Sequence, residues 1–411
     1  NVVDSVFVSW VSEEALTAVS LAFSLQNMMI AVGVGTGVGV NAMLSKSLGE
    51  KNQKRANATA ENGIFLSACS FLVFLVIGLT CIKPYFYAQT SDDAIALQGI
   101  RYLSVCCIFS LGLFTQTMGE KLLAATGRTQ LSMISQLVGA VVNIILDPIF
   151  IFGLDLGISG AAIATLLSQC VSASILASFF LRGQSEIRVS IRCVSTAPKI
   201  YLTIFKSGMP SFFRQGMASV SAMALNFNAG VYGDAAVAAM AIVTKVFNFL
   251  LSAVIGFGQG MQPVVGYNYG AKELGRVRQA VSFSLKFCTV ILTVAAAAGA
   301  VFAPQIVQFF RNDPAVVAVG TQAFRFQCIS LPLAAVLVFA NMLFQSLGKS
   351  WRASLLALCR QGMFFIPLVY LLPMHFGLLG LEVTQMCSDL IAFLVSAAFL
   401  LHYFRREFDR V

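Results

Sequence analysis

The chain carries an internal repeat that spans most of its length. Residues 35–51 read GTGVGVNAMLSKSLGEK, and residues 256–272 read GFGQGMQPVVGYNYGAK. At this one offset the same residue types face each other, namely Gly35, Gly37, Gly39, Gly49, Lys51 and Arg55 opposite Gly256, Gly258, Gly260, Gly270, Lys272 and Arg276. Further on, Gly127 faces Gly348, and after a slip of one residue Gly157 and Gly160 face Gly377 and Gly380. Such a repeat in an apolar chain predicts two related lobes around a central pathway, the plan of secondary transporters.

The composition places both copies in a membrane. Hydrophobic residues make up 58% of the chain and charged residues 11%, and the mean hydropathy is +0.82. Soluble domains carry about 25% charged residues, and here the deficit extends over the whole length. We therefore predict an all-α polytopic membrane protein. The ten cysteines form no CxxC pair and the two histidines form no ligand cluster. Nothing predicts a disulfide framework, a cofactor or an enzyme.

Apolar stretches of about 20 residues predict twelve membrane helices, six in each copy. The expected spans are 1–11, 15–43, 59–83, 98–124, 130–153, 157–181, 207–232, 235–267, 282–308, 316–346, 353–374 and 379–403. The chain opens partway into an apolar stretch, so we expect the first helix to be truncated. Because each copy has an even number of helices, both copies keep one orientation, and the pseudo-twofold axis should lie along the membrane normal.

Loop charges predict the topology. Basic residues gather in alternate connections, at 46–55, 121–128, 182–206, 272–286, 349–352 and 405–410. The opposite loops are short and acidic, with Glu13, Glu14, Asp92, Asp93, Asp155, Asp234 and Asp313. The positive-inside rule then places both termini in the cytoplasm and explains the net charge of +9 without nucleic acid. The expected organisation is an N-lobe at 1–182, a cytoplasmic linker at 183–206, a C-lobe at 207–404 and a cytoplasmic tail at 405–411.

One acidic residue lies deep in a predicted span. Asp147 occurs in VVNIILDPIFIFG, with Asn143 four residues earlier on the same helix face and Pro148 directly after it. A carboxylate at bilayer depth is costly, and proline removes an N–H and so frees a carbonyl and predicts a kink. Together these groups can hold a proton, Na⁺ or a bridging water. The alternative is a neutral aspartic acid that caps the kink.

Other polar residues at depth give weaker indications. Asp4 is either functional or an exposed residue near the extracellular end, and Thr165 either contributes a ligand or bonds its own backbone. Glu120 is interpreted as an interfacial or salt-bridge residue. Candidates for lining a substrate cavity are Asn27, Gln136, Gln169, Arg214 and Arg360. The run Gly33, Gly35, Gly37, Gly39 lacks a following GK[ST], so we interpret it as a site of close helix contact rather than a nucleotide loop.

Several motifs resemble those of the multidrug and toxic compound extrusion (MATE) transporters along essentially the whole chain. They are NVVDSVFVS, ALTAVSLAF, GVGVNAMLSKSLGEKN, LLAATGRT, NIILDPIF, GISGAAIAT, KSGMPSFFRQ and QPVVGYNYGAK. The pattern is most similar to the prokaryotic branch whose cation site lies in the N-terminal lobe. In that branch the resemblance implies a site for H⁺ or Na⁺ at Asp4, Asn143, Asp147 and Thr165. Another branch uses acids on helices 7 and 10, and segments 207–232 and 316–346 contain none.

The resemblance implies a monomeric, multi-pass protein of the cell membrane that exports amphipathic, mainly cationic small molecules by rocking cation antiport. An alternative is a flippase or exporter of a lipid-linked saccharide or another amphipathic metabolite. That alternative predicts a strongly cationic central cavity, whereas the basic residues at depth lie mainly in the second copy.

Overall fold

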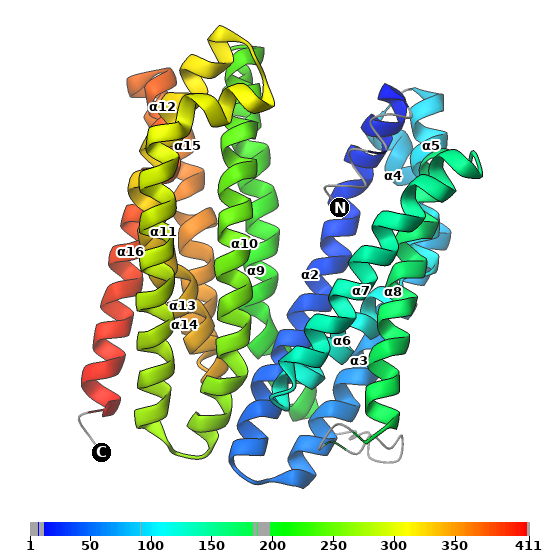
Figure 1. The fold of residues 1–411 in the computed structure, drawn as a ribbon, viewed down its shortest axis with the longest axis vertical. Helices are drawn as coiled ribbons and strands as arrows, with labels where there is room; N and C mark the ends of the chain where they lie inside the picture. The colour runs from blue at the N-terminus through cyan, green and yellow to red at the C-terminus, as the bar shows by residue number, and fades with distance from the viewer. Residues whose placement is uncertain (1–6, 8–11, 91, 184–186, 188–197, 409–411) are drawn as a thin grey trace. The chain divides into compact units, whose positions relative to one another are not determined.

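The computed structural model is almost entirely helical and describes residues 7, 12–90, 92–183, 187 and 198–408 (Figure 1). The described residues form no β-strand. The chain divides into two compact units, Asn1–Gly208 (unit 1) and Met209–Val411 (unit 2). The all-α fold predicted from the apolar segments is confirmed.

Unit 1 is a helical bundle whose long helices follow the predicted spans. Its elements are α2 (Glu13–Gly49), α3 (Gln53–Thr80), α4 (Ile82–Gln89), α5 (Asp93–Ile108), α6 (Leu111–Ala125), α7 (Thr129–Pro148), the π-helical turn η1 (Ile149–Gly153) and α8 (Gly157–Leu181). The predicted span 98–124 is bent by 46° between α5 and α6. The α-helical part of the predicted span 130–153 ends at Pro148, because proline supplies no N–H for the next α-helical bond.

Unit 2 repeats this arrangement of helices. Its elements are α10 (Asp234–Gly270), α11 (Leu274–Phe310), α12 (Pro314–Ser330), the 3₁₀ turn η3 (Leu331–Leu333), α13 (Ala334–Ser346), α14 (Ser350–Leu358), the π-helical turn η4 (Cys359–Met363), α15 (Phe365–Phe376) and α16 (Leu378–Phe408). A continuous apolar core around Phe247, Phe324, Phe339 and Phe344 holds the unit together. The rings of Phe247 and Phe324 lie 4.9 Å apart.

Helix α9 (Pro198–Gly230) contains the boundary between the two units. It begins at Pro198, within the segment expected to be a linker, and not at 207. Proline is favoured in the first turn of a helix, where its missing N–H costs nothing, and the following KIYLTIFK continues the helical pattern.

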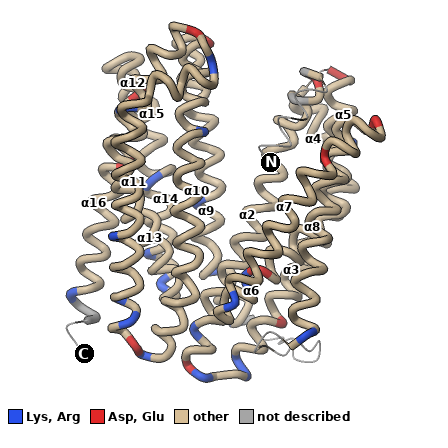
Figure 2. The backbone as a smooth tube through the Cα atoms, viewed as in Figure 1, with Lys and Arg blue, Asp and Glu red and all other residues tan. Residues whose placement is uncertain are grey.

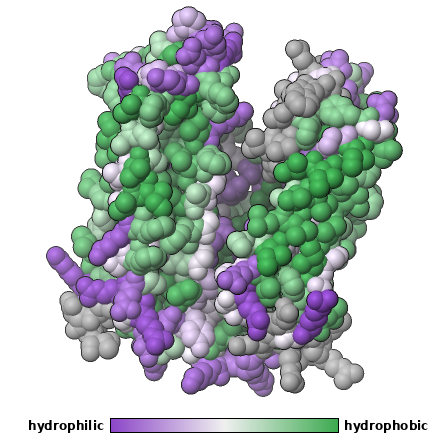
Figure 3. Space-filling model, viewed as in Figure 1, coloured by the Kyte–Doolittle hydropathy of each residue, from purple (hydrophilic) through white to green (hydrophobic). Residues whose placement is uncertain are grey.

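Nine helices in the described residues are long and apolar enough to cross a membrane, or ten when the bent pair α5 and α6 counts as one span. The predicted first span lies almost wholly outside the described residues, and the predicted seventh lies in α9. Large apolar side chains are exposed along α7 and α11, and Figure 3 shows broad hydrophobic faces on both units. Patches of this extent are rare on soluble proteins, and lipid covers them in a bilayer. The chain is therefore a multi-pass membrane protein.

The two copies of the sequence repeat have the same backbone conformation in their turns. Lys51 and its counterpart Lys272 adopt left-handed conformations with φ of 54° and 62°. Each follows a long helix, and each turn is closed by an N–H bond to the carbonyl five residues back, from Asn52 to Ser47 and from Glu273 to Asn268. These are helix C-terminal capping motifs of one kind. Figure 2 shows Lys and Arg gathered at the end of each unit that carries this turn.

A second pair of turns matches equally well. Gly127 and Gly348 have φ of 79° and 74°, in the region that favours glycine. The next residue in each case donates to the carbonyl five residues back, from Arg128 to Leu123 at 3.0 Å and from Lys349 to Phe344 at 2.9 Å. The two copies therefore share local geometry as well as residue types.

Glycines of the repeat also allow helices to approach closely. A Cβ atom on Gly160 would lie 2.6 Å from the backbone carbonyl of Phe150, and one on Gly380 would lie 2.2 Å from the carbonyl oxygen of Leu372. In unit 1, a Cβ on Gly39 would lie 2.2 Å from the carbonyl oxygen of Ile204 on α9, so this glycine makes a close helix contact as expected.

Candidate functional site

Helices α7 and α8 form a tightly joined pair in unit 1. The hydroxyl of Ser135 on α7 donates to the carbonyl oxygen of Ser172 on α8, and the hydroxyl of Ser172 donates to the carbonyl oxygen of Ser135, both at 3.0 Å. A Cβ atom on Gly139 would lie 2.0 Å from Ser172 Oγ. At the other end, Gly160 packs on the backbone of Phe150. The pair is thus fixed on both sides of Asp147 and Thr165.

Asp147 is fully buried on α7, with 0% of its surface exposed. Asn143 lies one turn earlier and donates from Nδ2 to Asp147 Oδ1 at 3.1 Å. The i, i+4 spacing read from the sequence therefore gives a direct contact. Pro148 follows, and the backbone bonding changes from α-helical to π-helical at that point, with the N–H of Leu154 bonded to the carbonyl of Ile149.

Thr165 is half-buried on α8, and its carbonyl oxygen accepts a bond from the Ser168 hydroxyl at 2.7 Å. Helices α7 and α8 run side by side (Figure 1). Asp4 lies outside the described residues, so the structure places three of the four residues of the candidate cation site.

A second buried carboxylate lies in unit 1. Glu120 on α6 is 7% exposed and accepts hydrogen bonds from Gln116 Nε2 at 2.9 Å and Gln136 Nε2 at 2.6 Å. The packing of α6 against α7 buries Glu120 and gives it two amide partners, and its position at the membrane interface stays a prediction. The sequence spacing could indicate only Gln116, since Gln136 is on the next helix.

The other polar candidates of unit 1 lie on separate helices. Asn27 is half-buried on α2. Gln136 on α7 is exposed apart from its bond to Glu120. Gln169 on α8 is half-buried, and its Cβ lies 3.3 Å from the place where a Cβ on Gly112 of α6 would be.

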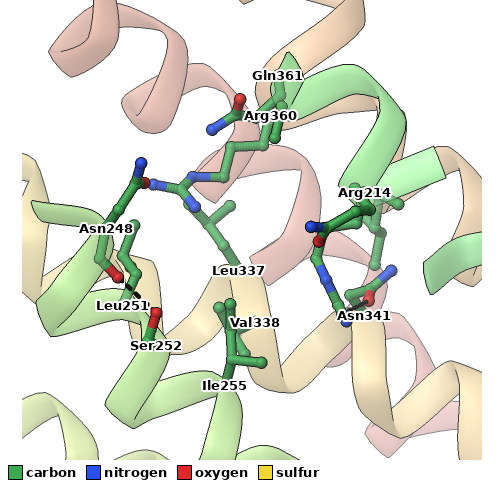
Figure 4. Close-up of a pocket in the computed structure, with 14 residues that line it drawn as sticks. Arg214, Asn248, Leu251, Ser252, Ile255, Leu337, Val338, Asn341, Arg360 and Gln361 are labelled. Atoms are coloured by element: carbon green, nitrogen blue, oxygen red, sulfur yellow. Dashed lines mark hydrogen bonds between the residues drawn. The ribbon is translucent and has the colours of Figure 1, made fainter. Parts of the chain in front are cut away.

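Unit 2 contains a polar pocket of about 250 Å³ that includes both candidate arginines (Figure 4). Helices α9, α10, α13 and α14, with the turn η4, supply the lining residues. Arg214 comes from α9, Asn248 and Ser252 from α10, Asn341 from α13, and Arg360 and Gln361 from η4. Asn248 is the residue that faces Asn27 across the repeat.

Arg360 is held in this pocket by an ion pair. Its Nε donates to Asp389 Oδ1 at 2.8 Å, and Asp389 on α16 is 2% exposed. Gln385 Nε2 donates to the same oxygen at 2.9 Å, and Ser330 Oγ donates to Oδ2 at 3.4 Å. The π-helical backbone of η4 is bonded by two hydroxyls, from Ser388 to the carbonyl of Arg360 and from Ser221 to that of Gln361.

A buried amide network surrounds Arg214. Its Nη1 donates to Asn341 Oδ1 at 3.4 Å, and Asn341 Nδ2 donates to the carbonyl of Ala353 at 2.6 Å. On the same side of α13, Gln345 accepts from Gln262 Nε2 at 3.0 Å and donates to Ser211 Oγ at 3.0 Å. The sequence alone does not indicate Asn341, Gln345 or Gln262, because single amides in apolar helices carry no spacing signal.

Comparisons with known proteins agree over most of the chain. The sequence model of the family described as MatE matches residues 1–149 and 210–371. The chain is 27% identical over 402 residues to the multidrug export protein MepA of Staphylococcus aureus, and also to MepA of Staphylococcus saprophyticus, with 95% of this chain and 86% of each relative covered.

Solved structures show the same fold. An outward-facing multidrug resistance MATE family transporter of the MOP superfamily superposes with a TM-score of 0.93 at 25% identity, covering 98% of this chain and 91% of that chain. A mutant of the MATE transporter VcmN of Vibrio cholerae gives 0.91 at 25% identity, covering 98% and 92%. With the family model matching most of its length, the chain belongs to the MATE family, whose members are transporters and not enzymes.

Proposed function

We propose that this protein is a cation-coupled antiporter that exports amphipathic, mainly cationic organic compounds. It would act as a monomer in the cell membrane, with both termini in the cytoplasm. The observation that carries the proposal is the carboxylate of Asp147, which is fully buried in a membrane-spanning helix beside the amide of Asn143. Its relatives named as multidrug export proteins support the direction and the class of cargo.

The chemistry of this site suits a small cation. A charge at the centre of a bilayer costs at least about 2.5–3.5 kcal/mol on insertion scales, so a buried carboxylate favours a bound H⁺ or Na⁺. Asn143 directs its N–H group at Asp147, which leaves its carbonyl oxygen as an acceptor. Carboxylate, amide and hydroxyl oxygens are the ligands that hard cations prefer, and Asp4 and Thr165 would complete such a set.

Coupling would act through α7. A cation bound at Asp147 lies next to Pro148, where the helical bonding changes, and can shift the end of α7 with the adjoining α8. The two lobes would then rock between outward and inward access. A potential of 100 mV supplies about 2.3 kcal/mol per charge, and one pH unit supplies about 1.4 kcal/mol. Exchange of one H⁺ for one monovalent cation moves no net charge, so only the pH gradient would drive it.

A lipid-linked saccharide flippase is the alternative. A diphosphate headgroup needs several uncompensated cations, and the pocket in unit 2 offers Arg214 together with an Arg360 that Asp389 already neutralises. This charge balance favours the export of small compounds.

The test is transport by the purified protein in proteoliposomes. A pH gradient and a Na⁺ gradient are imposed separately, and movement of the fluorescent cation rhodamine 6G against its own gradient is recorded. We expect one gradient to drive it. If neither gradient moves the dye, while dye binding to the protein is intact, the coupling proposal is wrong.

A further inference from the structure

The pocket in unit 2 has a positive lining. Fourteen residues line it, including the arginines Arg214 and Arg360, and none of them is an Asp or a Glu. In Figure 4 Arg214 lies beside Asn341 on one side, and Arg360 reaches across from η4 toward Asn248 on the other. A cationic group would be repelled here, so the cation of a substrate has to bind elsewhere.

Arg214 keeps most of its donors available. A guanidinium has five N–H groups, and the structure gives Arg214 one hydrogen bond, the long one from Nη1 to Asn341 Oδ1 at 3.4 Å. No acidic side chain of the described residues lies within ion-pair distance of Arg214. A half-buried, uncompensated arginine is costly in a membrane protein and typically marks a ligand path.

Arg360 is positioned by its ion pair and still presents donors. Asp389 and the groups that bond it hold Nε, whereas Nη1 and Nη2 make no hydrogen bond with the described residues. The planar fork of a guanidinium fits a carboxylate with two parallel bonds. With Asp389 balancing Arg360, the pocket retains one net positive charge, from Arg214. That charge matches a monoanion.

The walls and the size of the pocket indicate the polarity and the size of the ligand group that it can hold. Leu251, Ile255, Leu337, Val338 and Leu356 provide apolar walls beside the arginines. A volume of about 250 Å³ lies below the roughly 300–1,000 Å³ of sites that enclose a whole drug-sized molecule. The pocket therefore holds part of an amphipathic compound.

We propose that the pocket formed by Arg214, Arg360 and Asn248 binds the carboxylate of an amphipathic substrate. Compounds that carry both a cationic group and a carboxylate are then preferred cargo over their esters. The preference in binding follows from the pocket alone, and its consequence for transport rests on the export function proposed above.

Two dyes test this preference. Rhodamine 6G is an ethyl ester with a cationic ring system, and rhodamine 19 is the corresponding free acid with the same ring system. Binding of each to the purified, full-length protein in detergent is measured by fluorescence anisotropy. We expect wild-type protein to bind rhodamine 19 at least several-fold more tightly than rhodamine 6G. Equal affinities, or tighter binding of the ester, would overturn the proposal without any variant.

Variants of the lining residues test whether the preference for rhodamine 19 arises in this pocket. In Arg214→Gln the two affinities should become nearly equal, and Arg214→Lys, which keeps the charge, should retain part of the preference for rhodamine 19. The control is Arg325→Gln, which removes the same group from an exposed position on α12 outside the pocket and should keep the wild-type ratio. An unchanged ratio in Arg214→Gln, with both dyes still bound, contradicts the proposal.

A lipid phosphate is the competing source of an anion. If short-chain phosphatidylglycerol displaces rhodamine 19 from wild-type protein and this displacement needs Arg214, the pocket is a lipid site and the assignment to a substrate is wrong. A different result would separate the two proposals. If neither dye is transported along an imposed gradient, but rhodamine 19 still binds more tightly than rhodamine 6G and this preference needs Arg214, the export function is wrong and the binding site is still supported.

Discussion

At the scale of residues, the ion pair between Arg360 and Asp389 shows how unit 2 accommodates charge. Both partners are enclosed by α16, α12 and η4, and Asp389 gains two further hydrogen bonds. Removing one partner of a buried pair leaves the other charge uncompensated, whereas neutralising both costs much less.

We therefore expect Arg360→Met to destabilise the protein by about 3–5 kcal/mol. The double variant with Asp389→Asn should recover most of this loss, because it no longer contains the buried carboxylate that Arg360 neutralises. The measurement is the unfolding midpoint of the purified variants in one detergent. Arg325→Met, an exposed arginine on α12, serves as the control and should change the midpoint little. A double variant as unstable as Arg360→Met would contradict the ion-pair account.

Residue pairs four apart could be predicted from the sequence, but partners on different helices could not. The contact of Asn143 with Asp147 follows from helical geometry. Gln136, one of the two partners of Glu120, and Asp389, the partner of Arg360, lie on other helices, and apolar periodicity gives no rotation or depth for such pairs. For Glu120 the sequence gives only the distance from the end of the helix, and that distance alone indicated a position at the membrane interface.

At the scale of elements, helix pairs depend on glycines that the repeat places twice. Gly160 at the start of α8 packs on the backbone of Phe150 in η1, and Gly380 at the start of α16 packs on the backbone of Leu372 in α15. Backbone atoms cannot rotate away, so an added methyl group has to push the helices apart.

Gly160→Ala and Gly380→Ala should each destabilise the protein by about 1–3 kcal/mol, and Gly160→Ala should also disturb the neighbouring Asp147 site. Thermal unfolding of each variant, followed by intrinsic fluorescence, gives the comparison. Gly153→Ala and Gly275→Ala are the controls, since a Cβ at either position would meet nothing within 4 Å. Equal unfolding temperatures for variants and controls would refute the packing argument.

The apolar runs predicted which segments are helices, but not where all of them begin or bend. Helix α9 starts in a segment whose polarity suggested a linker, because a membrane helix can extend beyond the bilayer. The bend between α5 and α6 could not be predicted, because no proline lies there. The break at Pro148 was predicted, because proline interrupts the hydrogen-bond ladder. The 3₁₀ turn around Pro332 interrupts the span expected at 316–346, where no break was predicted.

At the scale of the whole molecule, the distribution of charge predicts the orientation in the membrane. Lys54 is exposed at the α2–α3 turn, in one of the basic connections, and Asp93 is exposed at the start of α5, on the acidic side. The positive-inside rule places the first in the cytoplasm and the second outside.

We expect a membrane-impermeant maleimide to label Asp93→Cys but not Lys54→Cys in intact cells. The native cysteines are first replaced by serine, including Cys81 and Cys170, which are exposed in the described part of the chain, and permeabilised cells provide the control in which both positions react. The opposite pattern would invert the topology and the proposed direction of export.

The two copies share turns and helix contacts but differ in charge. Asp147 belongs to unit 1, whereas Arg214 and Arg360 form the pocket of unit 2. Across the repeat, Arg360 faces Gly139, which packs tightly against Ser172 of α8. We therefore propose that the first copy couples transport to a cation and that the second copy binds the anion.

The most direct test of this account is Asp147→Asn in proteoliposomes, comparing substrate exchange with transport driven by a cation gradient. Asp155→Asn is the matched control, because Asp155 is exposed and asparagine tolerates its left-handed backbone. We predict that Asp147→Asn keeps rhodamine 6G exchange but loses gradient-driven accumulation by at least tenfold, while Asp155→Asn retains both. Gradient-driven accumulation at the wild-type level in Asp147→Asn would contradict the account.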